Sequence, residues 1–441
     1  MKTNDIKMFY KCGVAAGDIT PPVGAPLCGF AARKLHTSAG IYRPLRVVCL
    51  AVDDGNTPLL IVSAEIIFFE SIADRVRISI SQATGVPREN IILNATHTHC
   101  GPAVRTKDID IHGWIDHVYV DHFVRVLTAT AHTAWKNKFS AILKFYTGTC
   151  SLACCRRKPD SQHPGRILRS MLPYKNGISD HQVPVLTAET EDGIIRAVVF
   201  NYACHPTSRG GLLIGGDFPG FAYEYLDEAF PNALHLFLQG CGADQKPRPY
   251  NPDAEVFERR TIEQTREGGY ELGRAVENAV NSKAFLPVHG HLSVIQKFVN
   301  LQTEPLDHKL VEEYRNDSAE YKKRWADYHK KRIEMCESEN RTVVMELQTV
   351  RFGNSLAIPA LAAEAVVEHS IRLKNDLASD FAAVMPLAYI NHVIGYVPVK
   401  RQFDEYGYEV IDANMSRLYT GRFIPENEDI IHSAIQNMFR K

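Results

Sequence analysis

Two histidines separated by one residue, His97 and His99, are the first feature of this sequence that can do chemistry. They lie in the segment 94–102 (NATHTHCGP), which follows the apolar run 90–93 (NIIL) and ends in a Gly-Pro pair that stops a strand. Side chains two apart on extended backbone point to the same face. We therefore expect two imidazoles side by side at a strand end, where α/β sheets place binding sites. Imidazole is a common zinc ligand, but a hydrogen-bonded surface pair would have the same spacing.

A second histidine-bearing strand end follows further along the chain. The apolar run 194–202 leads into the segment 200–207 (FNYACHPT), where His205 precedes a proline that turns the chain away. Two such ends on one predicted sheet strengthen the metal interpretation, because a zinc site needs three or four ligands. Asp217 stands between glycines and the start of a predicted helix. It is either a helix N-cap or a residue that orients a ligand histidine.

A third strand runs into the glycine-rich turn 238–248 (LQGCGADQKPR), and a basic loop is found at 153–159 (ACCRRKP). Backbone N–H groups in such turns suit an oxyanion or another anion. The groups expected on the substrate side are Gly242, Asp244, Lys246 and Arg248 from the turn, and Arg156 and Arg157 from the loop. This largely cationic set predicts an anionic or hydroxyl-rich substrate.

The elements that must position these residues alternate in type. The segment 45–64 holds two apolar, partly β-branched runs around an Asp-Gly-Asn turn, which predicts a hairpin. An amphipathic helix at 68–85 and a strand at 91–96 follow. This pattern predicts an α/β fold with mixed sheets flanked by helices in a single large domain, 1–441. Within it, the charged segment at about 305–340 is typical of a solvated helical arm.

Composition narrows the class of protein. The chain has 441 residues, 45% of them hydrophobic and 23% charged, with a net charge of −1, which favours neither nucleic acid nor an acidic surface as a partner. No apolar run approaches the roughly 18 residues of a membrane helix, so we expect no stable membrane association. The start of the chain lacks the features of a secretory signal, and the ten cysteines are scattered. A cytoplasmic protein with reduced, buried thiols and a small-molecule substrate is expected.

These stretches, in this order, resemble the catalytic domain of the neutral/alkaline (non-lysosomal) ceramidase family. The most specific parts are the THTHxGP core at 96–102 and the His-Pro pair at 205–206, and the similarity extends from 17–22 (GDITPP) to 407–409 (GYE). The resemblance implies one zinc ion held by two histidines, a glutamate and a tyrosine. Carried over residue by residue, these ligands are His97, His205, Glu364 and Tyr396.

Spacing alone would not have selected the last two ligands. Glu364 opens a predicted helix, 364–375, where a carboxylate is favoured by the helix dipole. Tyr396 follows a predicted strand, 382–390, where ordinary packing would account for it. Only the resemblance nominates them as metal ligands.

Two features depart from the family pattern. The ceramidases carry a serine in a Gly-Asp-Val-Ser-Pro turn, whereas the equivalent turn here, 243–247 (ADQKP), has Lys246 in the serine's place. A lysine can bind a carboxylate, a phosphate or a developing oxyanion, or act as a base when desolvated. The family also continues into a C-terminal β-sandwich, which we do not expect in a chain of this length. Lipid-facing apolar loops are also hard to find in the sequence. The lysine in the turn and the shorter chain both argue against ceramide as the substrate.

The sequence therefore predicts a hydrolase that uses one Zn²⁺ ion and a metal-activated water to cleave an amide or ester bond. The expected substrate is small and polar or anionic, for example a sugar derivative. His99 is expected to carry the proton, because the ordinary histidine pKa of ~6.5 suits acid–base catalysis, with Asp244 and Lys246 as further catalytic groups. Two alternatives stay open: a metal-dependent lyase or isomerase of a sugar acid with Lys246 as base, and a catalytically silent binding protein.

Overall fold

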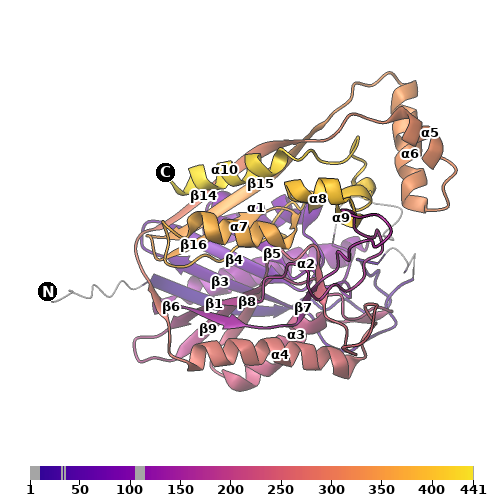
Figure 1. Ribbon diagram of the computed structural model, residues 1–441. Helices are drawn as coiled ribbons and strands as arrows, with labels where there is room; N and C mark the ends of the chain where they lie inside the picture. The colour runs from indigo at the N-terminus through magenta and orange to yellow at the C-terminus, as the bar shows by residue number, and fades with distance from the viewer. Residues whose placement is uncertain (1–9, 31–32, 34–35, 105–114, 441) are drawn as a thin grey trace.

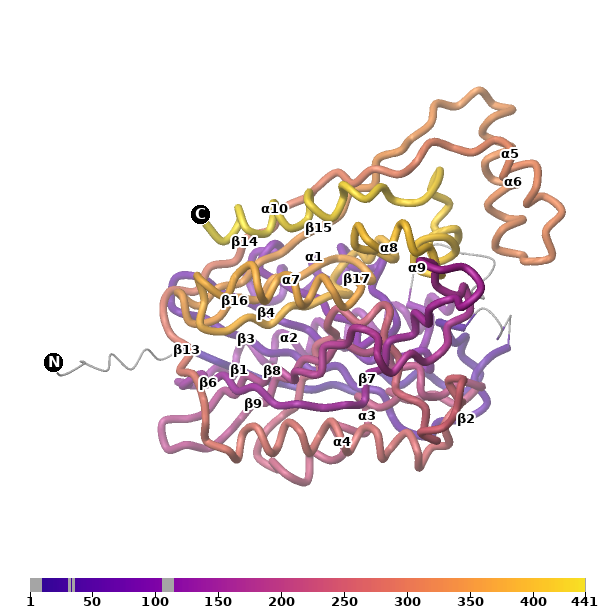
Figure 2. The backbone as a smooth tube through the Cα atoms, in the orientation of Figure 1, coloured from indigo at the N-terminus to yellow at the C-terminus, as the bar shows by residue number. Residues whose placement is uncertain are grey.

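The computed structural model describes residues 10–30, 33, 36–104 and 115–440, whose elements are labelled in Figures 1 and 2. The strands are β1 (Tyr10–Asp18), β2 (Gly40–Ile41), β3 (Arg46–Asp53), β4 (Pro58–Ala64), β5 (Ile91–Ala95), β6 (Phe139–Thr149), β7 (Ala153–Cys155), β8 (Gln182–Glu189), β9 (Ile195–Tyr202), β10 (Leu213–Ile214), β11 (Leu234–Gln239), β12 (Gln245–Pro247), β13 (Leu286–Val288), β14 (Leu292–Gln302), β15 (Thr342–Phe352), β16 (Leu356–Leu361), β17 (Glu364–Ala365) and β18 (Tyr396–Val397). The helices are α1 (Ala73–Thr84), α2 (His117–Lys136), α3 (Asp217–Ala229), α4 (Ile262–Asn281), α5 (His308–Tyr314), α6 (Glu320–Glu334), α7 (Val367–Leu377), α8 (Lys400–Glu405), α9 (Tyr408–Ile411) and α10 (Asn427–Phe439). Residues 1–9 lie outside the described residues. The expectation about a secretory signal at the start of the chain falls largely on these residues.

The alternation of side chains along β3 explains how the layers form. Val47 and Cys49 pack with helices α1 and α2, whereas Val48 and Leu50 point to the opposite face and pack with strands of a second sheet. Because successive side chains of a strand point to opposite faces, an apolar run without polar interruptions predicts burial on both faces. The central strand is therefore covered by helices on one side and by a sheet on the other.

The main sheet has nine strands in the order β11-β9-β8-β6-β1-β3-β4-β5, with β13 paired to β6. Its two outer pairs, β4–β5 and β9–β11, are parallel, and the pairs between them along this order are antiparallel. The fold class expected from the sequence, α/β with mixed sheets flanked by helices, is confirmed. The hairpin expected over 45–64 is also confirmed, with Gly55 at a φ of 91° in its turn.

The remaining elements complete four layers. Helices α3 and α4 join α1 and α2 on one face of the main sheet, and the three-stranded sheet β14-β15-β16 covers the other. Helices α7 and α10 pack on the outer face of that smaller sheet. Figure 1 shows helices α5 and α6 projecting beyond these layers, at the charged arm expected over 305–340.

Some expectations about single elements are wrong. The strand expected over 382–390 is present only as isolated bridges, such as Ala357–Val384. None of the ten cysteines, all of which lie in the described residues, forms a disulfide bond, and all except Cys336 are buried. No helix in the described part of the chain combines the length and apolarity that crossing a membrane requires.

A buried asparagine joins the two outer strands of the main sheet. Asn94 in β5 accepts a hydrogen bond from the backbone N–H of Gln239 in β11 at 2.8 Å, and its amide donates to the Ala388 carbonyl at 2.7 Å. Strands at opposite ends of the sheet order therefore meet at their carboxyl ends. His97 follows one of these strands and the glycine-rich turn follows the other.

A buried ion pair supports the same region from outside. Arg77 of α1 donates to Glu346 of β15 at 2.6 Å, and both side chains are buried. Glu346 also accepts from the side-chain amide of Asn391 at 2.8 Å. The side-chain oxygen of Asn391, Oδ1, accepts from the Leu93 N–H at 3.0 Å. This network connects α1, the smaller sheet and the strand that leads to His97.

Arg77→Met should lower the free energy of unfolding by roughly 3–5 kcal/mol, because the Glu346 carboxylate would stay buried without its cation. Arg75→Met on the same helix removes an exposed partner of Asp121 and should cost about 1 kcal/mol or less. Urea unfolding followed by circular dichroism measures both losses. Equal losses in the two variants would contradict the structural importance of the buried pair.

Candidate metal centre

His97 lies two residues beyond the end of β5, in a backbone conformation that side chains rarely adopt. Its φ is 67°, so the extended backbone expected across 97–99 is wrong at this position. The imidazole Nδ1 lies 3.0 Å from the Ile67 carbonyl and donates its hydrogen there, which leaves the Nε2 lone pair free. His97 and His99 are nevertheless neighbours, with ring centroids 4.8 Å apart. Backbone strain at this point therefore aims a histidine instead of continuing a strand.

His205 is oriented in the same way from the other side. It follows β9, and its Nδ1 donates to the Gly242 carbonyl at 2.8 Å, so that its Nε2 carries no hydrogen and offers a lone pair. A Cβ at Gly242 would lie 2.5 Å from the backbone nitrogen of Cys204, so the turn approaches His205 only because residue 242 is glycine. Gly242, expected on the substrate side, thus contributes its carbonyl to a histidine.

Glu364 and Tyr396 are paired residues of two short parallel strands, β17 and β18. The helix expected to begin at Glu364 begins at Val367, because the Glu364 N–H donates to the Gly395 carbonyl at 2.8 Å and keeps the chain extended. Residues paired across a parallel ladder lie side by side. This pairing brings together the two ligand candidates that residue spacing alone would not have selected.

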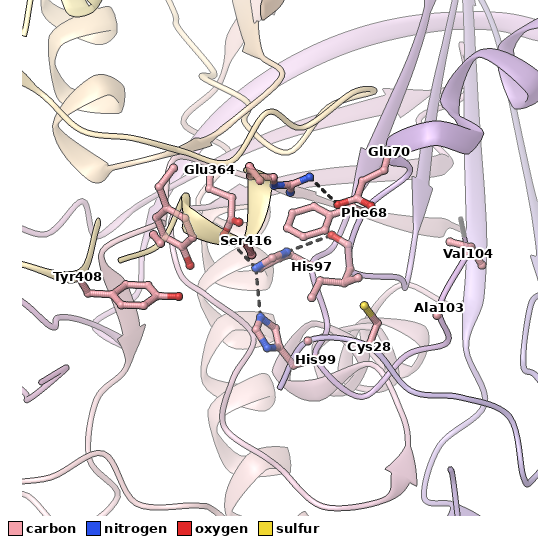
Figure 3. A pocket seen from close by; sticks show the side chains of 15 residues that line it. Cys28, Phe68, Glu70, His97, His99, Ala103, Val104, Glu364, Tyr408 and Ser416 are labelled. Atoms are coloured by element: carbon pink, nitrogen blue, oxygen red, sulfur yellow. Dashed lines mark hydrogen bonds and ion pairs between the residues drawn. The ribbon is translucent and has the colours of Figure 1, made fainter. Parts of the chain in front are cut away.

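The side chains of His97, His99 and Glu364 lie close together (Figure 3), and the polar atoms of His205 and Tyr396 meet the same group. Glu364 Oε2 lies 3.5 Å from both His97 Nε2 and His205 Nε2, and Tyr396 Oη lies 3.3 Å from His205 Nε2. His99 Nε2 lies 3.2 Å from His97 Nε2. In a tetrahedral zinc site with bonds of about 2.0–2.1 Å, neighbouring ligand atoms lie roughly 3.4 Å apart. The spacing of the set therefore fits one metal ion.

The bonding of the cluster also fits a cation. Glu364 Oε2 is buried and has no hydrogen-bond partner, and neither does the buried Nδ1 of His99. A buried carboxylate oxygen without a donor is costly unless a cation faces it. The buried group His97–His99–His205 can hold a metal ion, and Glu364 supplies the negative charge beside it.

Burial sets the protonation of the cluster. Desolvation, followed by the influence of His205, lowers the pKa of His97 to about 3. Desolvation and the charge of Arg156 lower the pKa of His205 to about 3. Desolvation raises the pKa of Glu364. Both histidines are therefore neutral near pH 7, which is the form that binds a metal.

A cavity of about 150 Å³ opens onto the cluster and is lined by His97, His99, Glu364 and Tyr396 (Figure 3). Its wall includes Arg417, which pairs with Glu70 at 2.9 Å. Sequence reasoning missed this ion pair, because no motif or spacing connects two residues so far apart in the chain.

Sequence reasoning also missed the aromatic side chains that pack around the histidines of the candidate metal site. Phe68 and Tyr389 pack against the His97 ring, with centroids at 4.8 Å and 4.4 Å. Phe30 lies in the same way against His99, with centroids 4.7 Å apart. These rings fix the imidazoles, and the sequence gives no signal for which aromatic residues would do so.

Most of the predicted substrate-side cations are engaged by internal carboxylates. Arg156 and Arg157 are buried and donate to the two oxygens of Glu409 at 2.8 Å and 2.7 Å. Arg248 forms a bidentate pair with Glu271 at 2.9 Å and 2.8 Å. The structure therefore does not place these guanidinium groups in the cavity as free substrate anchors. Arg156 instead lies with its Cζ 5.6 Å from the ring centre of Tyr396.

The two aspartates considered from sequence both satisfy backbone groups. Asp244 Oδ1 accepts from the Val367 N–H at the start of α7 at 2.9 Å, so Asp244 caps a helix and does not point toward the cavity as a catalytic group. Asp217 accepts from the N–H groups of Arg209 and Phe218 at 3.0 Å and 2.7 Å. The N-cap of α3 is Gly216 and Asp217 is the first residue of the helix, so the N-cap expected at Asp217 is wrong by one residue. Its carboxylate contacts backbone N–H groups and no histidine in the described part of the chain.

Lys246 differs from the other predicted cations. It lies in β12, half-buried, and its Nζ rests 4.8 Å from the ring centre of Phe257. Desolvation, followed by the charges of Arg156 and Arg259, lowers the pKa of Lys246 to about 8. Its charge in turn helps to lower the pKa values of His99 and His205. Lys246 is thus electrostatically coupled to the histidines of the candidate metal site.

Comparison with solved structures places this fold beside known ones. The neutral ceramidase from Pseudomonas aeruginosa matches with a TM-score of 0.75 and 16% identity, over 97% of this chain and 73% of that one. A structure described as ceramidase complexed with C2 matches with a TM-score of 0.73 and 16% identity, over 97% of this chain and 74% of that one. No protein-family model matches the sequence. At this identity the likeness establishes a shared fold.

The protonation of His97 makes a prediction for the metal-free protein. Its pKa is about 3 when folded, against about 6.5 in an unfolded chain, so the unfolded state binds more protons between these values. Stability should therefore fall as the pH falls through this window, with a slope of up to about 1.4 kcal/mol per pH unit from this histidine. Urea unfolding of chelator-treated protein between about pH 7 and pH 5 should show a shallower loss in His97→Gln than in the wild type.

The exposed His163, which pairs with Asp160 at 2.8 Å, provides the control. His163→Gln should not reproduce the shallower pH dependence of His97→Gln. A wild-type slope in His97→Gln would show that His97 is not buried in its neutral form.

Proposed function

We propose that this protein is a zinc-dependent hydrolase that cleaves an amide or ester bond in a small polar or anionic substrate. The observation that carries the proposal concerns Glu364 Oε2, which has no hydrogen-bond partner. It lies 3.5 Å from the Nε2 atoms of His97 and His205, which carry no hydrogen. The resemblance of the sequence motifs to neutral ceramidases supports the same ligand set. A catalytic zinc site keeps room for water or substrate, and the cavity beside the cluster offers that room.

In this proposal His97, His205, Glu364 and Tyr396 hold the ion. When bound, zinc activates water by lowering its pKa from about 15.7 towards ~7 and polarises the scissile carbonyl. Arg156 lies beside the Tyr396 ring, and Tyr396 and Glu364 both interact electrostatically with it. A fixed guanidinium at this place favours negative charge on the phenolic and carboxylate oxygens.

His99 and Lys246 are the groups proposed to act on the substrate. His99 has Nε2 at the edge of the cluster and a buried Nδ1 without a partner, so a proton can be taken up at one nitrogen and released at the other. Lys246, with its pKa near 8, can stabilise a developing oxyanion as an ammonium. It takes the place, though not the chemistry, of the serine found in the ceramidase motif.

The walls of the cavity combine apolar side chains such as Phe68 and Val104 with a charged pair. The Glu70–Arg417 ion pair forms part of the lining, and a long acyl chain would have to lie against these charges. Ceramide itself is therefore not proposed as the substrate. A small amide or ester with hydroxyl or anionic groups, such as a sugar derivative, fits the lining better.

A second reaction class keeps the metal and changes the chemistry. A lysine with a pKa near 8 has a sizeable neutral fraction at pH 7–8 and can act as a base, which favours a lyase or isomerase acting on a sugar acid. The third interpretation, a catalytically silent binding protein, rests on the loss of the serine. It requires zinc binding without turnover of amides, esters and glycosides.

Metal analysis of the purified protein should find close to one zinc ion per chain. His97→Ala and His205→Ala should each lose most of it, because each removes a neutral imidazole from the set. His99→Gln should retain the metal and lose roughly 10²–10⁴-fold in turnover, the usual contribution of a positioned acid or base. Near-stoichiometric zinc in both alanine variants would refute the assignment of the site, and loss of zinc in His99→Gln would make His99 a ligand.

The reaction class can be read from the mass of the product. Incubation with candidate amides and esters in H₂¹⁸O should give products that contain one added water and carry the heavy oxygen. Treatment with a chelator should abolish this turnover, and added Zn²⁺ should restore it. A metal-dependent product of unchanged mass would favour the isomerase. Zinc binding with no turnover across the panel would favour the silent binding protein.

A further inference from the structure

Three cations, Arg33, Lys246 and Arg259, act electrostatically on His99 or on one another, and no carboxylate among the described residues pairs with them. Arg259 and Arg33 lie with Cζ at 5.0 Å and 5.3 Å from the centre of the Phe30 ring, whose other neighbour is His99. Lys246 interacts electrostatically with Arg259 and with His99. Among the described residues, none of the three cations forms an ion pair, whereas Arg156, Arg157 and Arg248 each do.

Arg33 supplies a fixed charge behind this group. It is buried, and its Nε, Nη1 and Nη2 donate to the carbonyls of Gly211, Cys28 and His99 at 2.9 Å, 3.1 Å and 2.9 Å. Its donors are thus directed at neutral acceptors and its charge is not cancelled. Desolvation and the charge of Arg259 are among the causes that lower the pKa of Arg33.

Arg259 and Lys246 are the members of the group that can reach a ligand. Arg259 is exposed, Lys246 is half-buried, and Phe257 between them in the chain packs under Lys246 at 4.8 Å. The guanidinium of Arg259 occupies space that any other residue at position 210 would fill, since a Cβ on Gly210 would lie 1.3 Å from its Nη1. Glycine at this place makes room for the arginine.

The positive charge of Arg259 is unfavourable for the charged forms of Arg33 and Lys246. The charge of Arg259 lowers the pKa values of both Arg33 and Lys246. Asp217 acts on Lys246 from a distance, but its own oxygens accept backbone N–H groups. Like charges held together without a counter-ion are unfavourable, and an anion bound between them would remove the repulsion.

We propose that Lys246 and Arg259, backed by Arg33, form a subsite for an oxyanion of the substrate, a carboxylate or a phosphate, beside the Phe30 ring. The proposal rests on the proposed hydrolase function and narrows its substrate class. The substrate carries an anionic group a few bonds away from the amide or ester that reaches the metal cluster. Arginine offers such a group two parallel donors, and lysine offers a compact charge.

The subsite predicts that the zinc-loaded full-length protein binds inorganic phosphate or succinate saturably in isothermal titration. Arg259→Gln should weaken this binding about tenfold, the effect of losing one charge-assisted contact. Arg266→Gln is the matched control, because Arg266 is partly exposed but paired with Glu224 at 2.9 Å, and it should bind as the wild type does. No saturable binding of either anion, or equal binding in Arg259→Gln and the wild type, would overturn the subsite.

An anion that binds the zinc ion instead gives the opposite pattern. Binding at the ion should be lost in His97→Ala and kept in Arg259→Gln, whereas binding at the subsite should be kept in His97→Ala. Tighter binding of phosphate than of succinate would identify a phosphate as the natural group, and the reverse order a carboxylate. Gly210→Ala, which keeps every charge and displaces the Arg259 guanidinium, should also weaken binding.

Paired substrates separate this proposal from the hydrolase assignment. An N-acyl amino acid and its neutral carboxamide differ only in the anionic group, and the acid should have a kcat/KM about tenfold higher in the wild type but not in Arg259→Gln. Equal kcat/KM for the pair would refute the subsite and leave the hydrolase in place. Anion binding that depends on Arg259, without turnover of either compound, would refute the hydrolase and leave the subsite in place.

Discussion

The meeting of β5 and β11 at their carboxyl ends is the constraint on which the metal centre depends. These strands stand at opposite ends of the sheet order, and the buried Asn94 amide satisfies backbone groups on both sides of the junction. A buried amide that makes several hydrogen bonds has few alternative arrangements that leave none unmade. The two chain segments that follow the junction therefore emerge together, one carrying His97 and the other the Gly242 carbonyl that orients His205.

Several hydrogen-bond acceptors face one another at this junction. Carbonyls at Ile67 and Gly242 take the Nδ1 hydrogens of two histidines, so that two lone pairs and the Glu364 carboxylate face one another in a buried space. Such an arrangement of acceptors is unfavourable without a cation. The second layer of hydrogen bonds thus prepares the cluster for an ion, and the aromatic rings packed on His97 restrict its movement.

The sequence identified the parts of the site that are local and missed those that depend on distant pairing. Strand-end histidines and glycine-rich turns are visible in a single segment, and the α/β class follows from the alternation of elements. The resemblance added Glu364 and Tyr396, yet the backbone of Glu364 was expected to be helical, because only its ladder with Tyr396 makes it extended. In the same way, the charges of Arg156 and Arg157 looked available because their partner, Glu409, lies about 250 residues further along the chain.

Paired and unpaired charges are distributed differently in the walls of the site and in the surroundings of His99. Buried arginines that meet a carboxylate stabilise the walls, since leaving either partner alone would cost several kcal/mol. Within the described part of the chain no carboxylate forms an ion pair with Lys246 or Arg259, and a protein with a net charge of −1 does not lack carboxylates. Their isolation is therefore a property of this location and not of the overall composition. His99 and Arg259 contact the same Phe30 ring, so the proposed anion subsite lies one aromatic ring away from the proposed metal site. An anionic group bound there would fix the orientation of a substrate that reaches His99.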